Sequence, residues 1–224
     1  MIRRSVLISV LATTVWLSGC ATPDDPALKP LLALSDLQYD AGVIMNKAEN
    51  LYDEKKWDEA EIEYQRFLEL HPVHRWAPHA QFKLALCYDR RIPAVGRDPT
   101  IAEKAQTAFE RVLSYPDSRY HDAARAKLTE VRRHLAQSDF EVGRFYYKQG
   151  QYPAAIVRFQ KVLDAKVEGT VTEDAIYFLA LAYERDGQVD KATETAQALL
   201  DTFPHTRHAK NAAKLKARLS SRAG

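Results

Sequence analysis

Residues 48–72 read AENLYDEKKWDEAEIEYQRFLELHP, and this stretch sets the structural class. Apolar residues recur three, four and seven positions apart on both sides of DEKK, which is the spacing of two amphipathic helices. Ala48 lies on the first helix, Ala60 and Tyr64 lie on the second, and Pro72 ends it. The stretch therefore predicts a helical hairpin whose helices approach each other through small residues.

Three further segments repeat this arrangement. They carry Ala85, Tyr88, Ala105, Phe109 and Pro116; then Gly143, Tyr146, Gly150, Tyr152, Ala155 and Phe159; then Ala180, Tyr183, Gly187, Ala192, Leu199 and Pro204. The pattern resembles the tetratricopeptide repeat, in which small residues let two helices pack closely and an aromatic side chain fills the groove beside them. We predict an all-α tetratricopeptide-repeat α-solenoid of about four helix pairs.

The repeats depart from regular spacing at two places. The segment RIPAVGRDPT, residues 91–100, separates Ala85 from Ala105 and predicts a projecting loop, because two prolines and a glycine do not fit a tight turn. The segment HDAARAKLTEVRRHLAQ, residues 121–137, predicts one extra central helix. The basic, amphipathic residues 206–224 predict a capping helix at the carboxy-terminal end.

The amino-terminal residues predict export. A head with Arg3 and Arg4 precedes an apolar run, residues 6–17, which as a helix would span about 18 Å and fall short of a bilayer core of about 30 Å. This layout is typical of a signal peptide. Leu17-Ser18-Gly19-Cys20 resembles the bacterial lipoprotein box, which implies lipid on the thiol of Cys20; plain secretory cleavage is the alternative.

These features divide the chain into three parts. Residues 1–19 are the expected lipoprotein signal peptide, residues 20–36 the lipidated tether and residues 37–224 the tetratricopeptide-repeat domain. The tether carries three prolines, so it does not form one continuous helix. Within it and just after it, the apolar residues 31–37 are expected to dock on the folded domain.

Composition limits the classes of partner and site. Without residues 1–19 the count of Lys and Arg falls from 32 to 30, equal to the 30 Asp and Glu, so a nucleic-acid partner is not expected. Cys87 is the second of two cysteines and has no partner for an internal disulfide once Cys20 is lipidated. Its neighbours FKLALCYDRR have helical apolar spacing, which favours a small buried hydrophobe over a reactive thiol.

The sequence shows no motif of a catalytic site. A phosphate-binding glycine loop, a nucleophile elbow and a metalloprotease motif are all missing from the 224 residues. His71, His74 and His79 have spacings that metal ligands use, but the prolines around them fit a connection between repeats and no acidic or cysteine ligand lies among them. We therefore expect no enzyme activity, no metal and no cofactor.

A binding surface is expected on the first helix of each pair, which lines the concave face of a repeat stack. Its predicted lining residues are Met45, Tyr52, Phe82, Arg90, Phe140, Arg144, Tyr147, Tyr177 and Arg185. Aromatic side chains with arginines suit an extended peptide that ends in an aromatic residue and a carboxylate. The alternative is that Phe82, Phe140 and Tyr177 fill the core between repeats. Arg91, Arg97 and Asp98 form a second candidate contact in the projecting loop, for which the alternative is an inert insertion.

The chain as a whole resembles the BamD family of the bacterial β-barrel assembly machinery. The resemblance lies in the lipoprotein box, the proline-rich tether, the Arg97-Asp98-Pro99 loop before AEKAQTAFERVLSYPDSRY, and the long run AKLTEVRRHLAQSDFEVGRFYYKQGQYPAAIVRF. Members of that family have about five repeats, so one early repeat between Pro72 and Arg75 is expected to be lacking here.

The resemblance implies a periplasmic scaffold that is lipid-anchored at the outer membrane. Its implied partners are the barrel subunit BamA, other Bam lipoproteins and unfolded outer-membrane proteins. The amino-terminal half is implied to receive the carboxy-terminal signal of those clients, and the carboxy-terminal half to hold BamA. Ala21 after the lipidated cysteine favours the outer membrane, since Asp there is the usual retention cue for the inner membrane. The alternative function is that of another repeat lipoprotein, such as a secretin pilotin or a cell-envelope coordinator.

Overall fold

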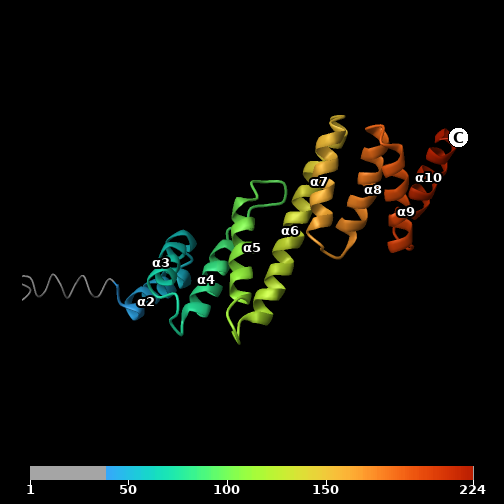
Figure 1. Ribbon diagram of the computed structural model, residues 1–224. Helices are drawn as coiled ribbons and strands as arrows, with labels where there is room; N and C mark the ends of the chain where they lie inside the picture. The colour runs from blue at the N-terminus through green and yellow to red at the C-terminus, as the bar shows by residue number, and fades with distance from the viewer. Residues whose placement is uncertain (1–38, 224) are drawn as a thin grey trace, which may run out of the picture. The chain divides into compact units, whose positions relative to one another are not determined.

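The computed structural model describes residues 39–223, and this part of the chain is built from helices (Figure 1). The helices are α2 (Ala41–Asp53), α3 (Trp57–Leu70), α4 (Ala77–Asp89), α5 (Thr100–Leu113), α6 (His121–Lys148), α7 (Tyr152–Asp164), α8 (Thr170–Arg185), α9 (Val189–Thr202) and α10 (Ala209–Ala223). None of the helices described here is long and apolar enough to span a bilayer. Residues 1–38, which include Cys20, the expected signal peptide, the expected tether and the whole of the expected docking segment 31–37, lie outside the described residues.

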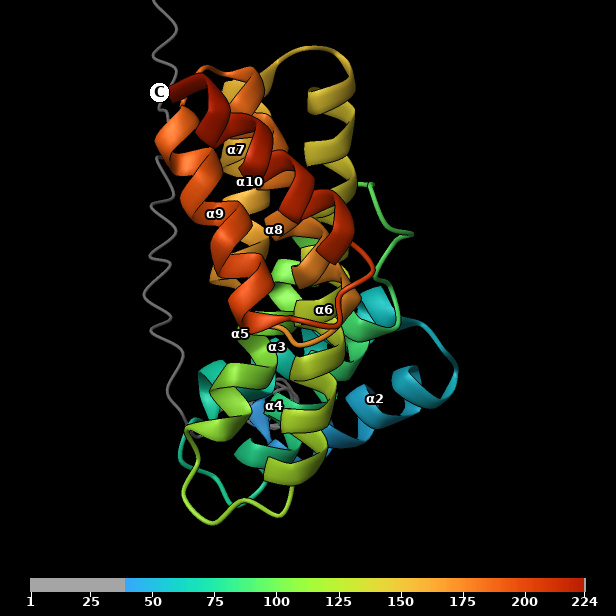
Figure 2. The ribbon, with the colours of Figure 1, turned by 90° about the vertical axis from the view of Figure 1, so that its right-hand side faces the viewer.

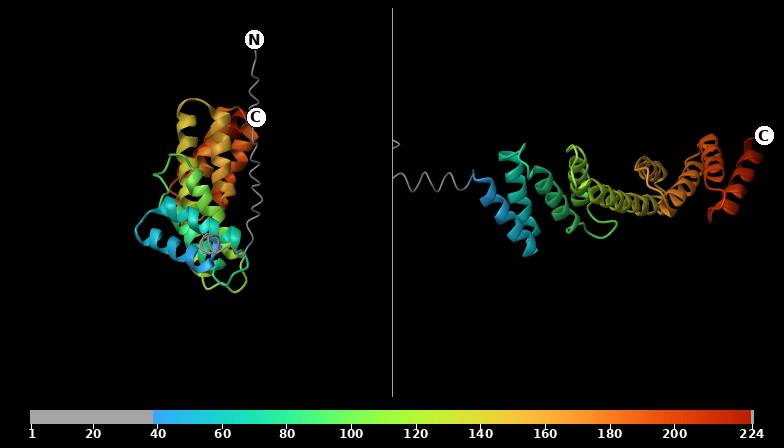
Figure 3. Two further views of the ribbon diagram at one scale, coloured as in Figure 1. Left: turned by 90° about the vertical axis from the view of Figure 1, so that its left-hand side faces the viewer. Right: turned by 90° about the horizontal axis from the view of Figure 1, so that it is seen from below.

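Within the compact unit that begins at Ala41, the helices pack in chain order. Each helix contacts the next one, and α6 also contacts α8, so the first helices of the last two pairs meet (Figures 1 and 3). Two hydrophobic clusters stabilise the stack. The first is formed by α2, α3, α4, α5 and the first half of α6, and the second by the second half of α6 and the helices from α7 to α10. The prediction of an all-α stack of helix pairs with a terminal capping helix is confirmed.

The small residues of the repeat pattern lie in the seam of each pair. Ala48, Ala85 and Ala180 on the first helices and Ala60, Ala105, Ala155 and Ala192 on the second helices have no exposed surface. At Gly143 there is no room for a side chain, since a Cβ atom placed there would lie 2.7 Å from Cε1 of Phe159, whose ring is fully buried. The regular spacing of small residues in the sequence therefore marks the positions where the two helices of a pair are in direct contact.

Left-handed residues make the tight turns within three of the pairs. Gly150 and Gly187 have φ of 74° and 80° between α6 and α7 and between α8 and α9. The corresponding position between α2 and α3 is Lys55, with φ of 61°. Since a side chain disfavours this conformation, the first pair reaches the same turn at a small local cost.

The extra central helix is not a separate element. Residues 121–137 form the first half of the 28-residue helix α6, because no proline interrupts His121–Lys148 and its lone glycine, Gly143, lies in the seam with α7. The first half of α6 contributes Leu128 and Val131 to one hydrophobic cluster, and the second half contributes Ala136 and Phe140 to the other. One continuous helix therefore joins the two halves of the repeat unit.

The loop between α4 and α5 packs back on the stack. In Figure 1 it is the green segment beside the upper end of α5. The amide of Gly96 donates to Oγ of Ser138 on α6, at 3.2 Å. Asp98 begins α5 by accepting hydrogen bonds from the amide and the hydroxyl of Thr100, and these bonds lower the pKa of Asp98. These contacts hold the part of the loop that leads into α5.

Cys87 lies in the core of α4 with no exposed surface, as expected. Burial, reinforced by the charge of Glu61, raises the pKa of its thiol to about 12. Because thiolates are the reactive form, we predict that Cys87 in the folded protein reacts with iodoacetamide at least about 100-fold more slowly than in guanidinium-unfolded protein at pH 8. Mass spectrometry of the alkylated peptide measures both rates, and equal rates would contradict this assignment.

Candidate functional site

A cleft of about 630 Å³ lies where α2, the start of α4 and the loop before α6 meet. Its lining residues are Met45, Arg75, Trp76, Pro78, His79, Pro116, Asp117, Ser118, Arg119 and Tyr120. Three separate sequence segments build it, since Met45 comes from α2, residues 75–79 from the start of α4, and residues 116–120 from the α5–α6 loop. The cleft therefore depends on the packing of the first two helix pairs against α6.

Aromatic rings form one wall of the cleft and two arginines its rim. The ring of Tyr120 stacks on Phe82 of α4, with centroids 4.8 Å apart and planes 18° apart. The guanidinium of Arg75 lies 5.1 Å from the centroid of Trp76, and that of Arg119 lies 4.9 Å from the centroid of Tyr120. Neither arginine forms an ion pair within the part of the chain that the structure describes, so both charges remain open to an anion.

A hydrogen-bond network behind the cleft fixes its polar wall. Glu49 of α2 accepts from Tyr64 at 2.8 Å and from Lys83 at 2.9 Å, and it lies 2.7 Å from Nε2 of His79. Partial burial acts to raise the pKa of Glu49, but the hydrogen bonds from His79, Lys83 and Tyr64 outweigh it and lower the pKa to about 2. The other ring nitrogen of His79 lies 2.6 Å from the hydroxyl of Tyr120. Glu49 thus orients His79, and His79 orients Tyr120.

This geometry suits a ligand that has both an apolar ring and a carboxylate. The aromatic wall accepts the ring, and the two guanidinium groups accept the charge with charge-assisted hydrogen bonds. The predicted residues Met45 and Phe82 contribute to this site, Met45 as a largely buried wall residue and Phe82 as the partly buried partner of Tyr120. Tyr52 lies nearby in the same half, where Lys83 stands 3.9 Å above its ring.

The predicted residues of the carboxy-terminal half form the second candidate site, a cluster of aromatic and arginine side chains between α6 and α8, which is called the α6–α8 cluster or the second cluster below. Phe178 is at its centre, with ring centroids 5.7 Å from Phe140, 5.9 Å from Tyr147 and 5.8 Å from Tyr177. Arg144 lies over the rings of Phe140 and Phe178, at 5.7 and 5.8 Å. Phe140 is only 4% exposed, which agrees with the core-filling alternative for that residue, whereas Tyr147 and Tyr177 are partly exposed.

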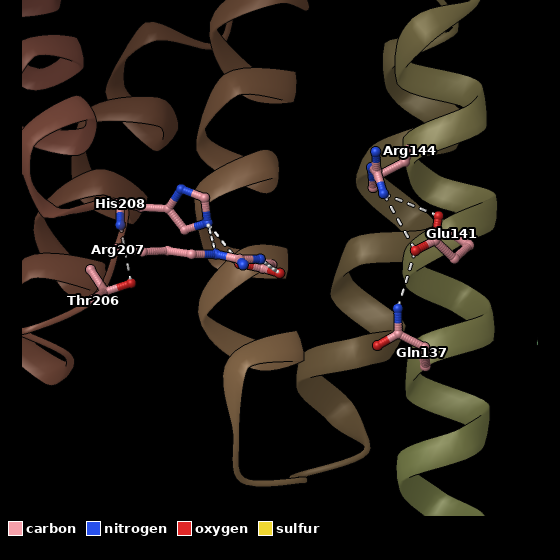
Figure 4. A network of polar contacts seen from close by, with 7 residues as sticks. Gln137, Glu141, Arg144, Thr206, Arg207 and His208 are labelled. Carbon is pink, nitrogen blue, oxygen red and sulfur yellow. Dashed lines mark hydrogen bonds and ion pairs between the residues drawn. The ribbon is translucent and has the colours of Figure 1, made fainter.

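Polar contacts position the edges of this second cluster. On α6, Glu141 lies between Gln137 and Arg144 and bonds both (Figure 4). The Nε atom of Arg144 is buried and has no hydrogen-bond partner among residues 39–223. Arg185 hydrogen-bonds Tyr147 and is exposed. Aromatic side chains and arginines therefore lie together in this cluster.

The loop before α10 closes the far side of the second cluster. His208 stacks on Tyr177 at 4.2 Å and bonds the buried Asp174 of α8 at 2.7 Å, and Arg207 also pairs with Asp174. Figure 2 shows α10 lying across α8, and Figure 4 shows the side chains of Arg207 and His208 directed toward α8. Asp174 thus holds the capping helix in place.

The arginines near the projecting loop differ in their surroundings. Arg90, Arg97 and Asp98 are exposed, as Arg97 and Asp98 were expected to be. The expectation that Arg91 is exposed is wrong: its side chain is 19% exposed because it pairs with Asp58 and Glu61 of α3. The guanidinium of Arg91 forms ion pairs with α3, so it links the end of α4 to α3.

Sequence reasoning missed Glu49, Arg75, Trp76, Arg119, Tyr120 and Phe178. Arg75 and Trp76 lie in the segment HPVHRWAPH, whose prolines predict a connection between repeats, and Arg119 and Tyr120 lie in YPDSRY, directly before the residues predicted to form the extra helix. The clue in both is an arginine beside an aromatic residue in a loop. Within residues 39–223 no group of three or more His, Cys, Asp or Glu side chains is placed to hold a metal ion, and His79 points to Glu49 and Tyr120 instead.

The cleft and the α6–α8 cluster both lie in the part of the chain that matches a known protein family. A family model described as YfiO, outer membrane lipoprotein, matches residues 36–199. The chain belongs to this family. The YfiO match includes the cleft and the α6–α8 cluster, and it ends within α9.

Curated relatives of the YfiO-family chain are outer membrane protein assembly factors named BamD, which confirms the resemblance. The relative from Caulobacter vibrioides is 33% identical over 157 residues, which cover 70% of this chain and 52% of that protein. Those from Neisseria meningitidis serogroup A and Rickettsia prowazekii are 29% and 28% identical, covering 68% and 72% of this chain and 61% and 64% of those proteins. The chain thus spans about half to two thirds of the length of the relatives it matches.

Proposed function

We propose that this protein is a lipid-anchored scaffold for the assembly of outer-membrane β-barrel proteins. In this proposal it faces the periplasm and acts without catalysis. The amino-terminal cleft receives the carboxy-terminal signal of an unfolded barrel protein, and the α6–α8 cluster holds a BamA-type barrel subunit together with other lipoproteins of the complex. Membership of the YfiO family and the names of the BamD relatives support this proposal.

One observation carries the client-binding part of the proposal. Arg75 and Arg119 stand at the rim of an aromatic cleft, and neither forms an ion pair among the residues described. A peptide whose last residue is aromatic presents a ring and a free carboxylate only a few ångströms apart. Such an end places its ring beside Trp76 or Tyr120 and its charge between the two guanidinium groups.

The test is the binding of a matched pair of peptides to the full-length lipidated protein in detergent. Both peptides end in phenylalanine, are acetylated at the amino end and carry a fluorophore there, and one has a free carboxylate while the other is amidated. We expect the amidated peptide to bind at least about tenfold more weakly, because a charge-assisted contact contributes about 1.5 kcal/mol or more. Equal affinities in fluorescence anisotropy would contradict a carboxylate site.

The proposal for the second cluster is tested by site-specific crosslinking. A photoreactive residue placed at Tyr147 or Tyr177 in cells should capture a BamA-type subunit, and one placed at the exposed Arg133 of α6 serves as the control position. Capture of one secretin and no barrel subunit would instead favour a pilotin. Loss of many different barrel proteins on depletion would support the assembly function, whereas loss of a single secretin would not.

The lipid anchor gives a separate prediction. Replacing Cys20 with serine removes the thiol that is expected to carry diacylglycerol, and three acyl chains with about 0.8 kcal/mol for each buried methylene hold a protein far more firmly than one. We expect the Cys20→Ser protein to move to the soluble fraction after a high-salt wash, with its helical circular dichroism unchanged. Retention of Cys20→Ser in membranes that lack its protein partners would contradict anchoring through this residue.

A further inference from the structure

The protons of the cleft network can be placed from its donors and acceptors. Glu49, whose pKa is lowered to about 2, is ionised at neutral pH and only accepts, so Nε2 of His79 donates to it. Arg119 only donates, and its Nη2 lies 2.6 Å from the hydroxyl of Tyr120. With neutral His79, the hydroxyl proton of Tyr120 therefore goes to Nδ1 of the imidazole, at 2.6 Å. In this state Tyr120 has no proton left for a ligand.

Protonation of His79 reverses one of these bonds. Both ring nitrogens of an imidazolium donate, so Nδ1 gives its proton to the oxygen of Tyr120, which already accepts from Arg119. The two lone pairs of that oxygen are then occupied and its own proton is free. Because Tyr120 lines the cleft, this proton is available to an anionic ligand bound there.

We propose that the cleft binds a peptide carboxylate together with one proton, which is taken up by His79 and offered to the ligand through the hydroxyl of Tyr120. This inference rests on the proposed function of the cleft as a peptide site. It makes Tyr120 a third donor beside Arg75 and Arg119, and it makes the affinity for clients depend on pH. A histidine is suited to this role, since it changes charge between pH 5 and 8.

The groups around His79 are consistent with proton uptake by this residue. From α2 the negative charge of Glu49 faces it, from α3 Tyr64 reaches the same carboxylate, and from α4 Lys83 pairs with that carboxylate on its other side. From the α5–α6 loop Tyr120 faces it directly, and Arg119 and Asp117 line the cleft beyond. Lysine, arginine and tyrosine titrate well above pH 8 and aspartate and glutamate well below pH 5 in general, which leaves histidine to change charge in the range between.

Other histidines near the cleft do not connect to it in this way. His74 accepts a hydrogen bond from the amide of Trp76 at 3.2 Å, and His121 bonds the carbonyl of Tyr115 at 2.7 Å. Neither contacts Tyr120 through a ring nitrogen. His121 follows Tyr120 directly in the chain and is therefore the matched control for a titrating neighbour.

Isothermal titration calorimetry of the full-length protein with the acetylated, phenylalanine-ended peptide tests the proposal. Binding is measured at pH 7.5 in phosphate and in Tris, whose ionisation enthalpies differ, so that the difference in heat gives the number of protons taken up. We expect about half a proton or more, and an affinity that rises about tenfold from pH 8 to pH 6. The peptide itself has no group that titrates in this interval.

Three variants separate this linkage from other causes. His79→Gln and Tyr120→Phe should bind without proton uptake and with an affinity that is nearly constant from pH 8 to pH 6, while His121→Gln should behave as the wild type. Circular dichroism confirms that each variant is folded. Peptide binding with no proton uptake by the wild type, or unchanged uptake in Tyr120→Phe, would overturn the proton linkage alone. Failure of the peptide to bind at any pH would overturn the peptide site itself.

Discussion

Replacing Gly143 with leucine should lower the free energy of unfolding by about 3 kcal/mol or more. Even a Cβ atom at this position lies 2.7 and 2.9 Å from two ring atoms of Phe159 and 3.2 Å from Cβ of Arg158. The ring of Phe159 is fully buried among the residues of its cluster, so moving it disturbs their packing. A leucine therefore forces α6 and α7 apart, which also removes buried contacts of Ala155 and Phe140.

Urea unfolding followed by circular dichroism measures this effect. Gly143→Ala should cost less, because the better helix propensity of alanine, about 1 kcal/mol, offsets part of the clash. Phe145→Leu, at a residue of the same helix that is 59% exposed, is the control and should change stability by about 0.5 kcal/mol or less. Combining Gly143→Ala with Phe159→Leu should recover part of the loss of the alanine variant. A Gly143→Leu protein as stable as the wild type would show that the two helices are not in close contact.

The double substitution Arg75→Glu and Arg119→Glu should weaken binding of the phenylalanine-ended peptide at least about 100-fold. Each guanidinium is expected to make a charge-assisted contact of about 1.5 kcal/mol or more, and tenfold in affinity corresponds to about 1.4 kcal/mol. Reversal of both charges adds repulsion to the lost contacts. Because both arginines are exposed, the helical circular dichroism and the unfolding midpoint should change little.

A matched variant shows whether the position of the charges matters. Arg97→Glu with Arg133→Glu changes the net charge by the same amount at exposed residues outside the cleft, and it should bind the peptide within about twofold of the wild type. The double variant in the cleft should also lose the distinction between the carboxylate and amidated peptides. Equal weakening by both double variants would indicate general electrostatic attraction in place of a site.

The helix pairs were predictable because their signal is local. Ala48 and Ala60, or Gly143 and Ala155, are close in sequence, and each pair of positions belongs to two helices joined by a short turn. Because the small residues must lie in the seam, they recur at a regular spacing, which can be recognised in a single sequence. The same local reasoning identified Arg144 and Tyr147 of the α6–α8 cluster, but it missed Phe178 at the centre of that cluster.

The cleft was not predictable because its parts are distant in sequence. His79 and Tyr120 are 41 positions apart, and Glu49 lies 30 positions before His79. Their contact depends on how α2, α4 and the start of α6 pack, which no periodic pattern records. The pairing of Arg91 with Asp58 and Glu61 was missed for the same reason. A polar residue in a loop can be recognised from sequence, but its partner cannot.

The continuity of α6 sets the spacing between the cleft and the α6–α8 cluster. Tyr120 of the cleft precedes the first residue of α6 and Tyr147 lies beside its last, and a helix of 28 residues is about 40 Å long. With no proline in it and with packing along both halves, α6 acts as a spacer of fixed length. If the cleft holds the end of a client and the far cluster holds a barrel subunit, the length of this helix determines how far the client's last residue is kept from its destination.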